Sequence, residues 1–281
     1  MKKTLSIVLA VLMILSCIVA FTGCKKKDDA GTSTTSAGET DTQGNEEVDP
    51  DGDLQYIIDK GTLIVGVTPY PPMDYLENGE WVGFDAEYAK AVAEKLGVEV
   101  EFIEIDWKQK VFELDAKKID VVWNGMTITD ELKKSMSITA PYAENAQVVI
   151  VPNDKASEYT SLEDMMELTF AVEEGSAGAG VAEENALNVV NLGTQADALL
   201  EVSTGKADAC IVDLTMANAV LAEGSSYSNL TNVLSLNEEE FGIGCRTGSD
   251  LCAKINAITA ELIADGTLDA LATKYNVAII K

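Results

Sequence analysis

Apolar and β-branched runs alternate with helical patterns from residue 54 to the end of the chain. Residues 63–68 have the composition of a first strand. Over residues 84–96 the apolar side chains fall on one helical face, the charged ones fall on the opposite face, and Gly97 ends the pattern. This order predicts a strand followed by an amphipathic helix, the repeating unit of an α/β fold with largely parallel sheets.

The same alternation continues along the chain. Further strands are predicted at residues 99–105, 119–123, 147–151, 169–172, 188–192 and 208–212, and further helices at residues 108–117, 177–187 and 194–204. Two of these strands deliver Asn124 and Asp213 at their carboxyl ends. Because ligands in open α/β sheets sit beyond the carboxyl ends of the strands, we expect these two residues to flank a crevice between two lobes.

The first residues have the plan of an export signal. Lys2 and Lys3 precede an apolar run over residues 5–21, and the run ends at Gly23-Cys24. Residues 21–24 resemble the bacterial lipobox, so residues 1–23 are predicted to be a cleaved signal peptide and Cys24 to be lipidated. The alternative is an uncleaved signal anchor, since about 17 apolar residues lie near the shortest span of a bilayer.

Residues 24–53 are predicted to be the lipidated cysteine and a disordered tether, because they are rich in Thr, Ser, Gly, Asp and Glu and offer almost nothing to bury. The protein is therefore expected outside the cytoplasm, held on the cell membrane by the lipid on Cys24.

Charge and composition exclude several classes of function. Among 281 residues, 47 are Asp or Glu, 20 are Lys or Arg, and none is His. Such an excess of acid repels nucleic acid, and the lack of His removes the commonest general base and metal ligand. We therefore expect no nucleic-acid partner, no metal, no cofactor and no enzymatic activity.

Three cysteines lie far downstream of the leader, at Cys210, Cys245 and Cys252. Three thiols cannot all pair with one another, and unpaired cysteines are usually buried. We expect small buried hydrophobic residues, and a bridge between Cys245 and Cys252 stays open.

Several short motifs follow one another in a fixed order from Gly61 onward. They are GTLIVGV at residues 61–67, YPP at 70–72, VGFD at 82–85, NGMTIT at 124–129, GS at 175–176 and DGTL at 265–268. Together they resemble the family 3 extracellular solute-binding proteins, the amino-acid receptors of ATP-driven importers. The resemblance covers about 220 residues.

The resemblance implies a type II periplasmic-binding-protein fold, with a mixed, mostly parallel sheet in each lobe and a hinge of two crossing strands. The crossings would lie near residues 145–152 and 239–246. Lobe 1 would comprise residues 54–147 and 241–281, and lobe 2 residues 148–240. The protein would be a monomer that closes on a small polar or cationic, amino-acid-like solute and docks on an ABC permease.

The resemblance also implies a set of ligand-binding residues. Aromatic walls would come from Tyr70 and Trp107, a ligand-facing loop from Asn124, Gly125 and Thr127, further contacts from Glu173 and Ser176, and the partner of the ligand's α-amino group from Asp213. The alternatives are ordinary ones. The two aromatic residues would then be core residues, and Asn124, Thr127, Ser176 and Asp213 would cap helices.

One position departs from the family pattern. Leu132 stands where the family's amino-acid receptors have an arginine that clamps the ligand carboxylate. Lys133 is expected to face solvent, and Arg246, on the predicted return strand, is a doubtful substitute. The preferred ligand is therefore expected to be cationic, or to carry a neutral group in place of the free α-carboxylate. Alternatively, Ser176 and the N–H groups near Gly175 hold a carboxylate without any arginine.

Two other functions compete with the receptor. A few relatives of these receptors are dehydratases of small carboxylic acids, and an extracellular sensor would use the same fold. No nucleophile motif supports the enzyme.

Overall fold

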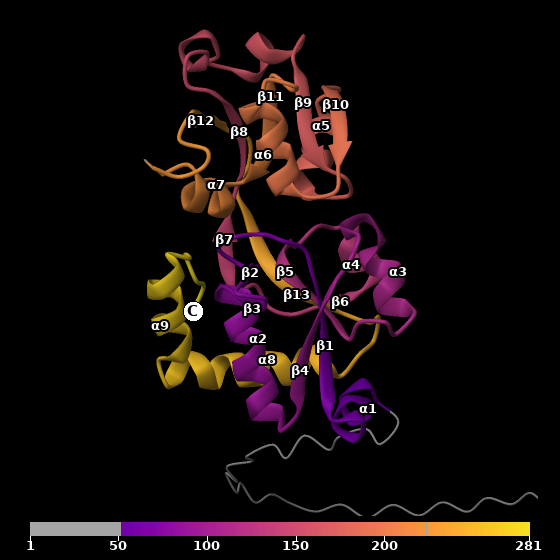
Figure 1. The fold of residues 1–281 in the computed structure, drawn as a ribbon. Coiled ribbons are helices and arrows are strands. Elements are labelled where there is room, and N and C mark those ends of the chain that lie inside the picture. The colour runs from indigo at the N-terminus through magenta and orange to yellow at the C-terminus, as the bar shows by residue number, and fades with distance from the viewer. Residues whose placement is uncertain (1–51, 223) are drawn as a thin grey trace, which may run out of the picture. The chain divides into compact units, whose positions relative to one another are not determined.

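The structure is a computed structural model that describes residues 52–222 and 224–281 (Figure 1). The predicted signal peptide, Cys24 and nearly all of the predicted tether lie outside the described residues. Two sheets organise the described part of the chain, and each defines one lobe. We call them the first and second lobes.

The first lobe is built on a six-stranded sheet. Its strands are β1 (Thr62–Val67), β4 (Glu99–Glu104), β5 (Val121–Thr127), β6 (Ser137–Ile138), β7 (Ala143–Asn145) and β13 (Glu239–Cys245). They lie in the order β4-β1-β5-β13-β6, with β7 also paired to β13. β1 is parallel to both β4 and β5, whereas β13 returns antiparallel to β5. A small hairpin of β2 (Tyr75–Glu77) and β3 (Glu80–Val82) follows β1.

Helices of the first lobe come from both ends of the described chain. They are α1 (Asp53–Lys60), α2 (Phe84–Leu96), η1 (Trp107–Gln109), α3 (Lys110–Asp115), α4 (Leu132–Ser135), α8 (Leu251–Ala264) and α9 (Thr267–Tyr275). The predicted apolar face of α2 is buried, because Phe84, Tyr88 and Val92 are fully inaccessible. Gly97 ends this helix in the left-handed conformation, which glycine adopts at little cost.

The second lobe is built on a five-stranded sheet. Its strands are β8 (Gln147–Pro152), β9 (Thr169–Glu173), β10 (Asn188–Leu192), β11 (Ala209–Asp213) and β12 (Leu230–Ser235), in the order β10-β9-β11-β8-β12. Helical segments are η2 (Ala156–Glu158), η3 (Leu162–Met165), α5 (Ala177–Glu184), α6 (Gln195–Ser203) and α7 (Leu214–Val220). β9 is parallel to β10 and β11, and β8 is antiparallel to β11, so the sheet is mixed.

The chain passes between the lobes twice, close to the predicted crossings (Figure 1). β7 pairs with β13 in the first sheet, and β8 starts the second sheet after the single residue Ala146. Gln147, predicted in lobe 1, pairs with Asp213 in the second sheet. Glu239 and Glu240, predicted in lobe 2, pair with β7 in the first sheet. The pairing partners therefore shift both predicted boundaries by one or two residues.

Helix α1 starts at Asp53, the last residue of the predicted tether. Arg246 Nε lies 3.0 and 2.9 Å from the two oxygens of the Asp53 carboxylate. The predicted tether at residues 24–53 is therefore wrong at its last residue, which the ion pair ties to the first lobe.

The cysteines differ from one another. Cys245, at the end of β13, and Cys252, in α8, form a disulfide bond, which is the bridge that the sequence left open. Cys210 is a free, fully buried thiol in β11, as expected for a small hydrophobic residue.

Candidate functional site

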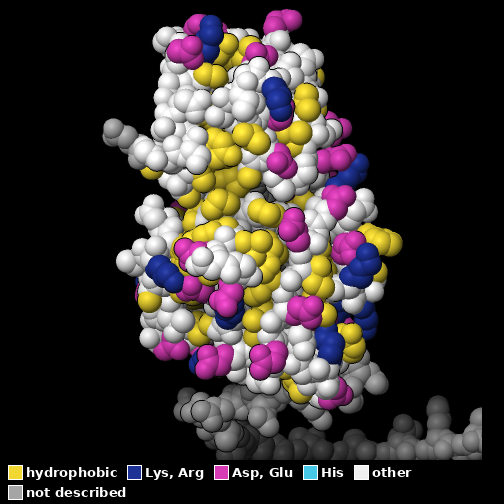
Figure 2. Space-filling model, in the orientation of Figure 1, with side chains coloured by type: hydrophobic (Ala, Val, Ile, Leu, Met, Phe, Trp, Pro, Cys, Tyr) yellow, Lys and Arg dark blue, Asp and Glu magenta, His cyan; other side chains and the backbone are white. Residues whose placement is uncertain are grey.

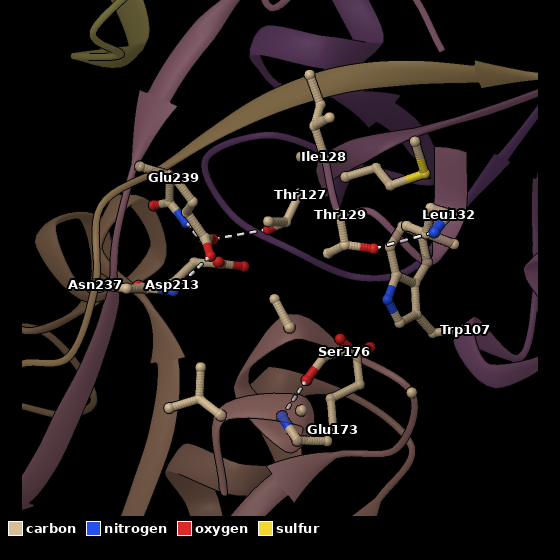
Figure 3. Close-up of a pocket in the computed structure, with 18 of the residues that line it drawn as sticks. Trp107, Thr127, Ile128, Thr129, Leu132, Glu173, Ser176, Asp213, Asn237 and Glu239 are labelled. Carbon is tan, nitrogen blue, oxygen red and sulfur yellow. Dashed lines mark hydrogen bonds between the residues drawn. The ribbon is translucent and has the colours of Figure 1, made fainter. Parts of the chain in front are cut away.

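A cleft of about 1730 Å³ lies between the lobes. Its walls come from β5 and the start of β13 in the first lobe, and from the carboxyl ends of β9 and β11 and the start of α5 in the second. All eight predicted site residues line it. Figure 3 shows Thr127, Asp213 and Glu239 together on one side and Trp107 beside Leu132 on the other. The volume exceeds the roughly 300–1,000 Å³ of ordinary small-molecule pockets.

Asp213 is the last residue of β11 and is 3% exposed. Asn145 Nδ2 and Gln147 Nε2 each donate to its Oδ1 at 2.6 Å, and the Gln195 amide donates to its other oxygen. Burial, followed by the negative charge of Glu239, raises the pKa of Asp213 to about 7. Asp213 is therefore a fixed carboxyl group whose ionised form lacks a cationic partner among the described residues.

Glu239 is a second acidic group of this cluster, and sequence reasoning missed it. Its Oε1 accepts hydrogen bonds from Thr127 Oγ1 at 2.7 Å, Asn145 Nδ2 at 2.7 Å and Gln147 Nε2 at 2.8 Å. Glu239 and Asp213 thus share two donors, which places like charges near each other. Only its place at the start of a crossing strand could have indicated Glu239.

The two predicted aromatic walls differ in their surroundings. Tyr70 is 2% exposed, its ring stands edge-on to Phe241, and its buried hydroxyl finds no hydrogen-bond partner among the described residues. Burial and the nearby Asp213 carboxylate raise the pKa of Tyr70. Trp107 packs in the apolar cluster that includes Leu114 and Leu132, so the core alternative describes part of its role. Both rings also line the cleft.

Asn124, Gly125 and Thr127 do not form a loop, because β5 extends to Thr127. Pairing with β13, which the local sequence cannot indicate, continues the strand through these residues. The Asn124 side chain is used inside the lobe, since Nδ2 donates to Asp74 at 2.7 Å and Oδ1 accepts from the Thr68 N–H at 2.9 Å. Asn124 therefore faces the cleft without a free side-chain amide.

Gly125 is required by a close contact with Tyr70. Its φ is +55°, and a Cβ there would lie 2.6 Å from Tyr70 Cε1. The Gly125 N–H donates to buried Asp85 at 2.6 Å. Gly125 therefore lets the aromatic ring approach the strand, whereas the prediction had a ligand in that place.

Glu173 and Ser176 lie between the carboxyl end of β9 and the start of α5, where they line the cleft. Glu173 ends β9, is 3% exposed, and its Oε1 has no hydrogen-bond partner in the described part of the chain. Burial and then the charge of Asp213 raise the pKa of Glu173 to about 8. Ser176 caps α5, its Oγ accepting from the Ala179 N–H at 3.1 Å. The capping alternative for Ser176 is thus present, and its hydroxyl proton stays able to donate.

Positive groups are few in the cleft. Lys133 is exposed and pairs with Asp130 at 3.3 Å, as expected from its place beside Leu132. Arg246 lies in a buried ion cluster with Asp53 and Asp120, so it is no substitute for the missing arginine. Lys110, which sequence analysis took as part of an ordinary helix, is buried and lines the cleft.

The described residues offer no metal centre, because no three His, Cys, Asp or Glu side chains among them are placed to hold an ion. Within the same residues no helix is both long and apolar enough to cross a membrane. On the face shown in Figure 2, acidic and basic side chains are scattered and hydrophobic side chains gather across the middle. The site is therefore described by its carboxyl groups, amides and aromatic rings.

Known proteins resemble this chain over most of its length. The model of the bacterial extracellular solute-binding proteins, family 3, matches residues 63–278. The L-cystine-binding protein TcyJ of Escherichia coli (strain K12) is 29% identical over 231 residues, which cover 80% of this chain and 86% of that protein.

Two solved structures share the fold. An arginine-bound variant of ArgBP from T. maritima has a TM-score of 0.69 and 34% identity, covering 74% of this chain and 99% of that one. The ancestral amino acid-binding protein AncCDT-1, a precursor of cyclohexadienyl dehydratase, has a TM-score of 0.72 and 32% identity, covering 79% and 98%. This likeness confirms the predicted type II periplasmic-binding-protein fold.

Proposed function

This chain belongs to the family 3 bacterial extracellular solute-binding proteins, and we propose that the solute it captures is a cationic amino acid. As a member of this family, the protein is an exported receptor that binds an amino-acid-like solute and delivers that solute to the permease of an ABC importer. The finer assignment rests on one observation. Three carboxyl groups, those of Asp213, Glu239 and Glu173, face a cleft in which acidic residues outnumber lysines.

Crowding of like charge favours a cation in this cleft. Burial raises the pKa values of both Asp213 and Glu173. The negative charge of Glu239 raises the pKa of Asp213 further, and the negative charge of Asp213 raises that of Glu173. A bound cation would stabilise their ionised forms, neither of which forms an ion pair within the described part of the chain. In the pose we propose, the α-ammonium lies against Asp213 and the side-chain cation reaches the unpartnered Oε1 of Glu173. The rings of Tyr70 and Trp107 would contact the ligand stem.

Relatives support this class of solute. One solved structure with 34% identity holds arginine, although TcyJ, a relative with 29% identity, is described as binding L-cystine. A thermal-shift panel with arginine, lysine, histidine, glutamine, glutamate and cystine tests the proposal, because a ligand well above its Kd raises the unfolding temperature. We expect the largest shifts with arginine or lysine. Larger shifts with glutamate or glutamine would overturn it.

Binding should also depend on pH. The pKa of Asp213 is about 7 in the free protein, so below pH 7 a cationic ligand must displace a proton from Asp213 to gain its charge. Glu173, with a pKa of about 8, acts in the same direction. Lys110, whose pKa burial lowers to about 8, acts in the opposite direction as it loses its charge above pH 7.5. We therefore expect affinity for arginine to rise at least about tenfold from pH 6 to pH 7.5, with proton release at pH 6.5. Calorimetry in two buffers of different ionisation enthalpy measures both, and an affinity that is flat or falls with pH would contradict the account.

We also propose that the receptor performs no chemistry on its solute. AncCDT-1 is itself an amino acid-binding protein although an enzyme descended from it, so the fold alone decides nothing. The absence of any histidine from the sequence argues for the receptor. Incubation with small hydroxy and keto carboxylic acids, followed by chromatography, should give no product. Turnover that Asp213→Asn abolishes would establish the dehydratase-like alternative.

The chain is further proposed to be a monomer tethered by lipid on Cys24, because a positive n-region and an apolar run lead to Gly23-Cys24. Mass spectrometry of the mature N-terminus from the native host should show diacylglycerol on Cys24. An unmodified Cys24 would contradict the lipid anchor without affecting the receptor function.

A sensor that reports to a signalling partner is the other candidate function. Failure of the protein to stimulate the ATPase of a cognate importer would favour the sensor.

A further inference from the structure

Lys110 is a buried cation that faces the cleft. It is the first residue of α3 and is 6% exposed. Its Nζ donates to the Trp107 carbonyl at 3.2 Å and to the Gly175 carbonyl at 2.9 Å, and lies 4.7 Å from the centroid of the Trp107 ring. A lysine ammonium has three protons to donate, so one donor direction is left. Lys110 thus reaches from the first lobe to the loop that opens α5 in the second.

The charge of Lys110 is not neutralised inside the described chain, where the ammonium forms no ion pair with a carboxylate. Its neighbour Lys108 contrasts with it, since Lys108 is half exposed and lies 2.5 Å from Glu174 Oε1. Burial lowers the pKa of Lys110 to about 8, against the charges of Glu173, Glu131 and Asp106. A buried ammonium without an anionic partner costs several kcal/mol. An anion from outside the chain would complete this site.

Glu173 does not serve as that anion. Lys110 and Glu173 form no ion pair, and the pKa of Glu173 is raised to about 8, first by burial. The charge of Lys110 lowers the pKa of Glu173, but by less than burial raises it, and no hydrogen bond or ion pair joins the two side chains. The two groups therefore sit near each other as separate, incompletely satisfied charges.

The surroundings of Lys110 suit a carboxylate. Nζ bonds to Gly175, directly before Ser176 and the start of α5, a helix of eight residues whose N-terminus carries partial positive charge. Leu132 supplies no donor to this part of the cleft and packs near Trp107 (Figure 3). On the proposed function, that the solute is an amino acid, we propose that the Lys110 ammonium holds the ligand's α-carboxylate together with the start of α5. Lys110 would then bind the ligand carboxylate in place of the arginine that is absent at Leu132.

The test crosses two ligands with three variants. Arginine and agmatine differ only in the α-carboxylate, so their affinity ratio reports how strongly that group is held. In the unchanged protein we expect arginine to bind about 30-fold more tightly than agmatine. Lys110→Met should weaken arginine about 30-fold and agmatine less than threefold, and Lys110→Arg should restore most of the ratio. Lys108→Met, a neighbouring lysine already paired with Glu174, should leave the ratio unchanged.

The outcomes separate this inference from the proposed function. Equal affinity of the unchanged protein for arginine and agmatine would overturn the role of Lys110 while leaving the cationic preference standing. Equal losses for both ligands in Lys110→Met would also overturn it, showing that Lys110 only joins the lobes through Gly175. If the panel selects a neutral amino acid, the proposed cationic class fails. The same comparison of variants, made with that amino acid and its decarboxylated amine, then decides the role of Lys110. If the Lys110→Met protein does not fold, Lys110→Gln takes its place in the test.

Discussion

Replacing Asp213 by asparagine is expected to weaken arginine binding about 100-fold. The substitution keeps the shape of the side chain and removes the charge that meets the ligand's α-ammonium. Truncating one member of a buried charge pair costs about 2–5 kcal/mol, and 1.4 kcal/mol is a factor of ten in affinity. Asp213 is 3% exposed and is held by three side-chain amides, so little water screens its charge. Calorimetric titration at pH 8 measures the loss.

A second carboxylate of the cleft provides the control. Glu240 lines the cleft but is exposed, so Glu240→Gln should change the affinity less than threefold. Thermal unfolding of both variants without ligand shows whether the fold persists. An Asp213→Asn protein that folds and binds arginine within fivefold of the original would remove Asp213 from the site.

Replacing Asp120 by alanine is expected to lower the free energy of unfolding by about 4 kcal/mol. Asp120 is fully buried, and its carboxylate accepts from Lys60 Nζ at 2.5 Å, the Ile64 N–H at 2.8 Å and Arg246 Nη2 at 3.3 Å. Alanine would leave Lys60 without its partner, a backbone N–H unsatisfied, and buried Arg246 with one carboxylate fewer. Breaking a buried pair in this way costs about 3–5 kcal/mol. Urea unfolding followed by circular dichroism measures the change.

An exposed ion pair gives the matched comparison. Lys133 and Asp130 lie 3.3 Å apart, with Asp130 91% exposed, so Asp130→Ala should change the unfolding free energy by less than about 0.5 kcal/mol. Equal effects of the two substitutions would show that the buried cluster does not stabilise the first lobe.

Local sequence patterns predicted most of the fold, because strands and helices of this chain have clear periodicities. β10 at Asn188–Leu192 was predicted at those residues, and α2 at Phe84–Leu96 was predicted with its buried face. β5 was predicted to stop at residue 123. Its last two residues, Met126 and Thr127, pair with β13 more than 100 positions downstream, and no local pattern indicates that pairing.

Asp213 was predicted from its place at a strand end and Glu173 from the family resemblance, and both line the cleft. Lys110 and Glu239 were missed because each is placed in the cleft by contacts with the other lobe. Lys110 meets the Gly175 carbonyl 65 positions away, and Glu239 meets Gln147 across the hinge, 92 positions away. A lysine in a short helix and a glutamate in an acidic run both have the composition of a solvated surface. Only the tertiary contacts show that they belong to the cleft.

Calorimetric titration with arginine and with citrulline at pH 8 tests the cationic assignment most directly. Citrulline has nearly the shape of arginine and the same α-amino and α-carboxylate groups, but its side chain is neutral. We expect one arginine per chain, bound at least tenfold more tightly than citrulline, because Glu173 would lose its cationic partner with the neutral side chain. Citrulline binding as tightly as arginine, or more tightly, would contradict the proposal that this receptor selects a cation.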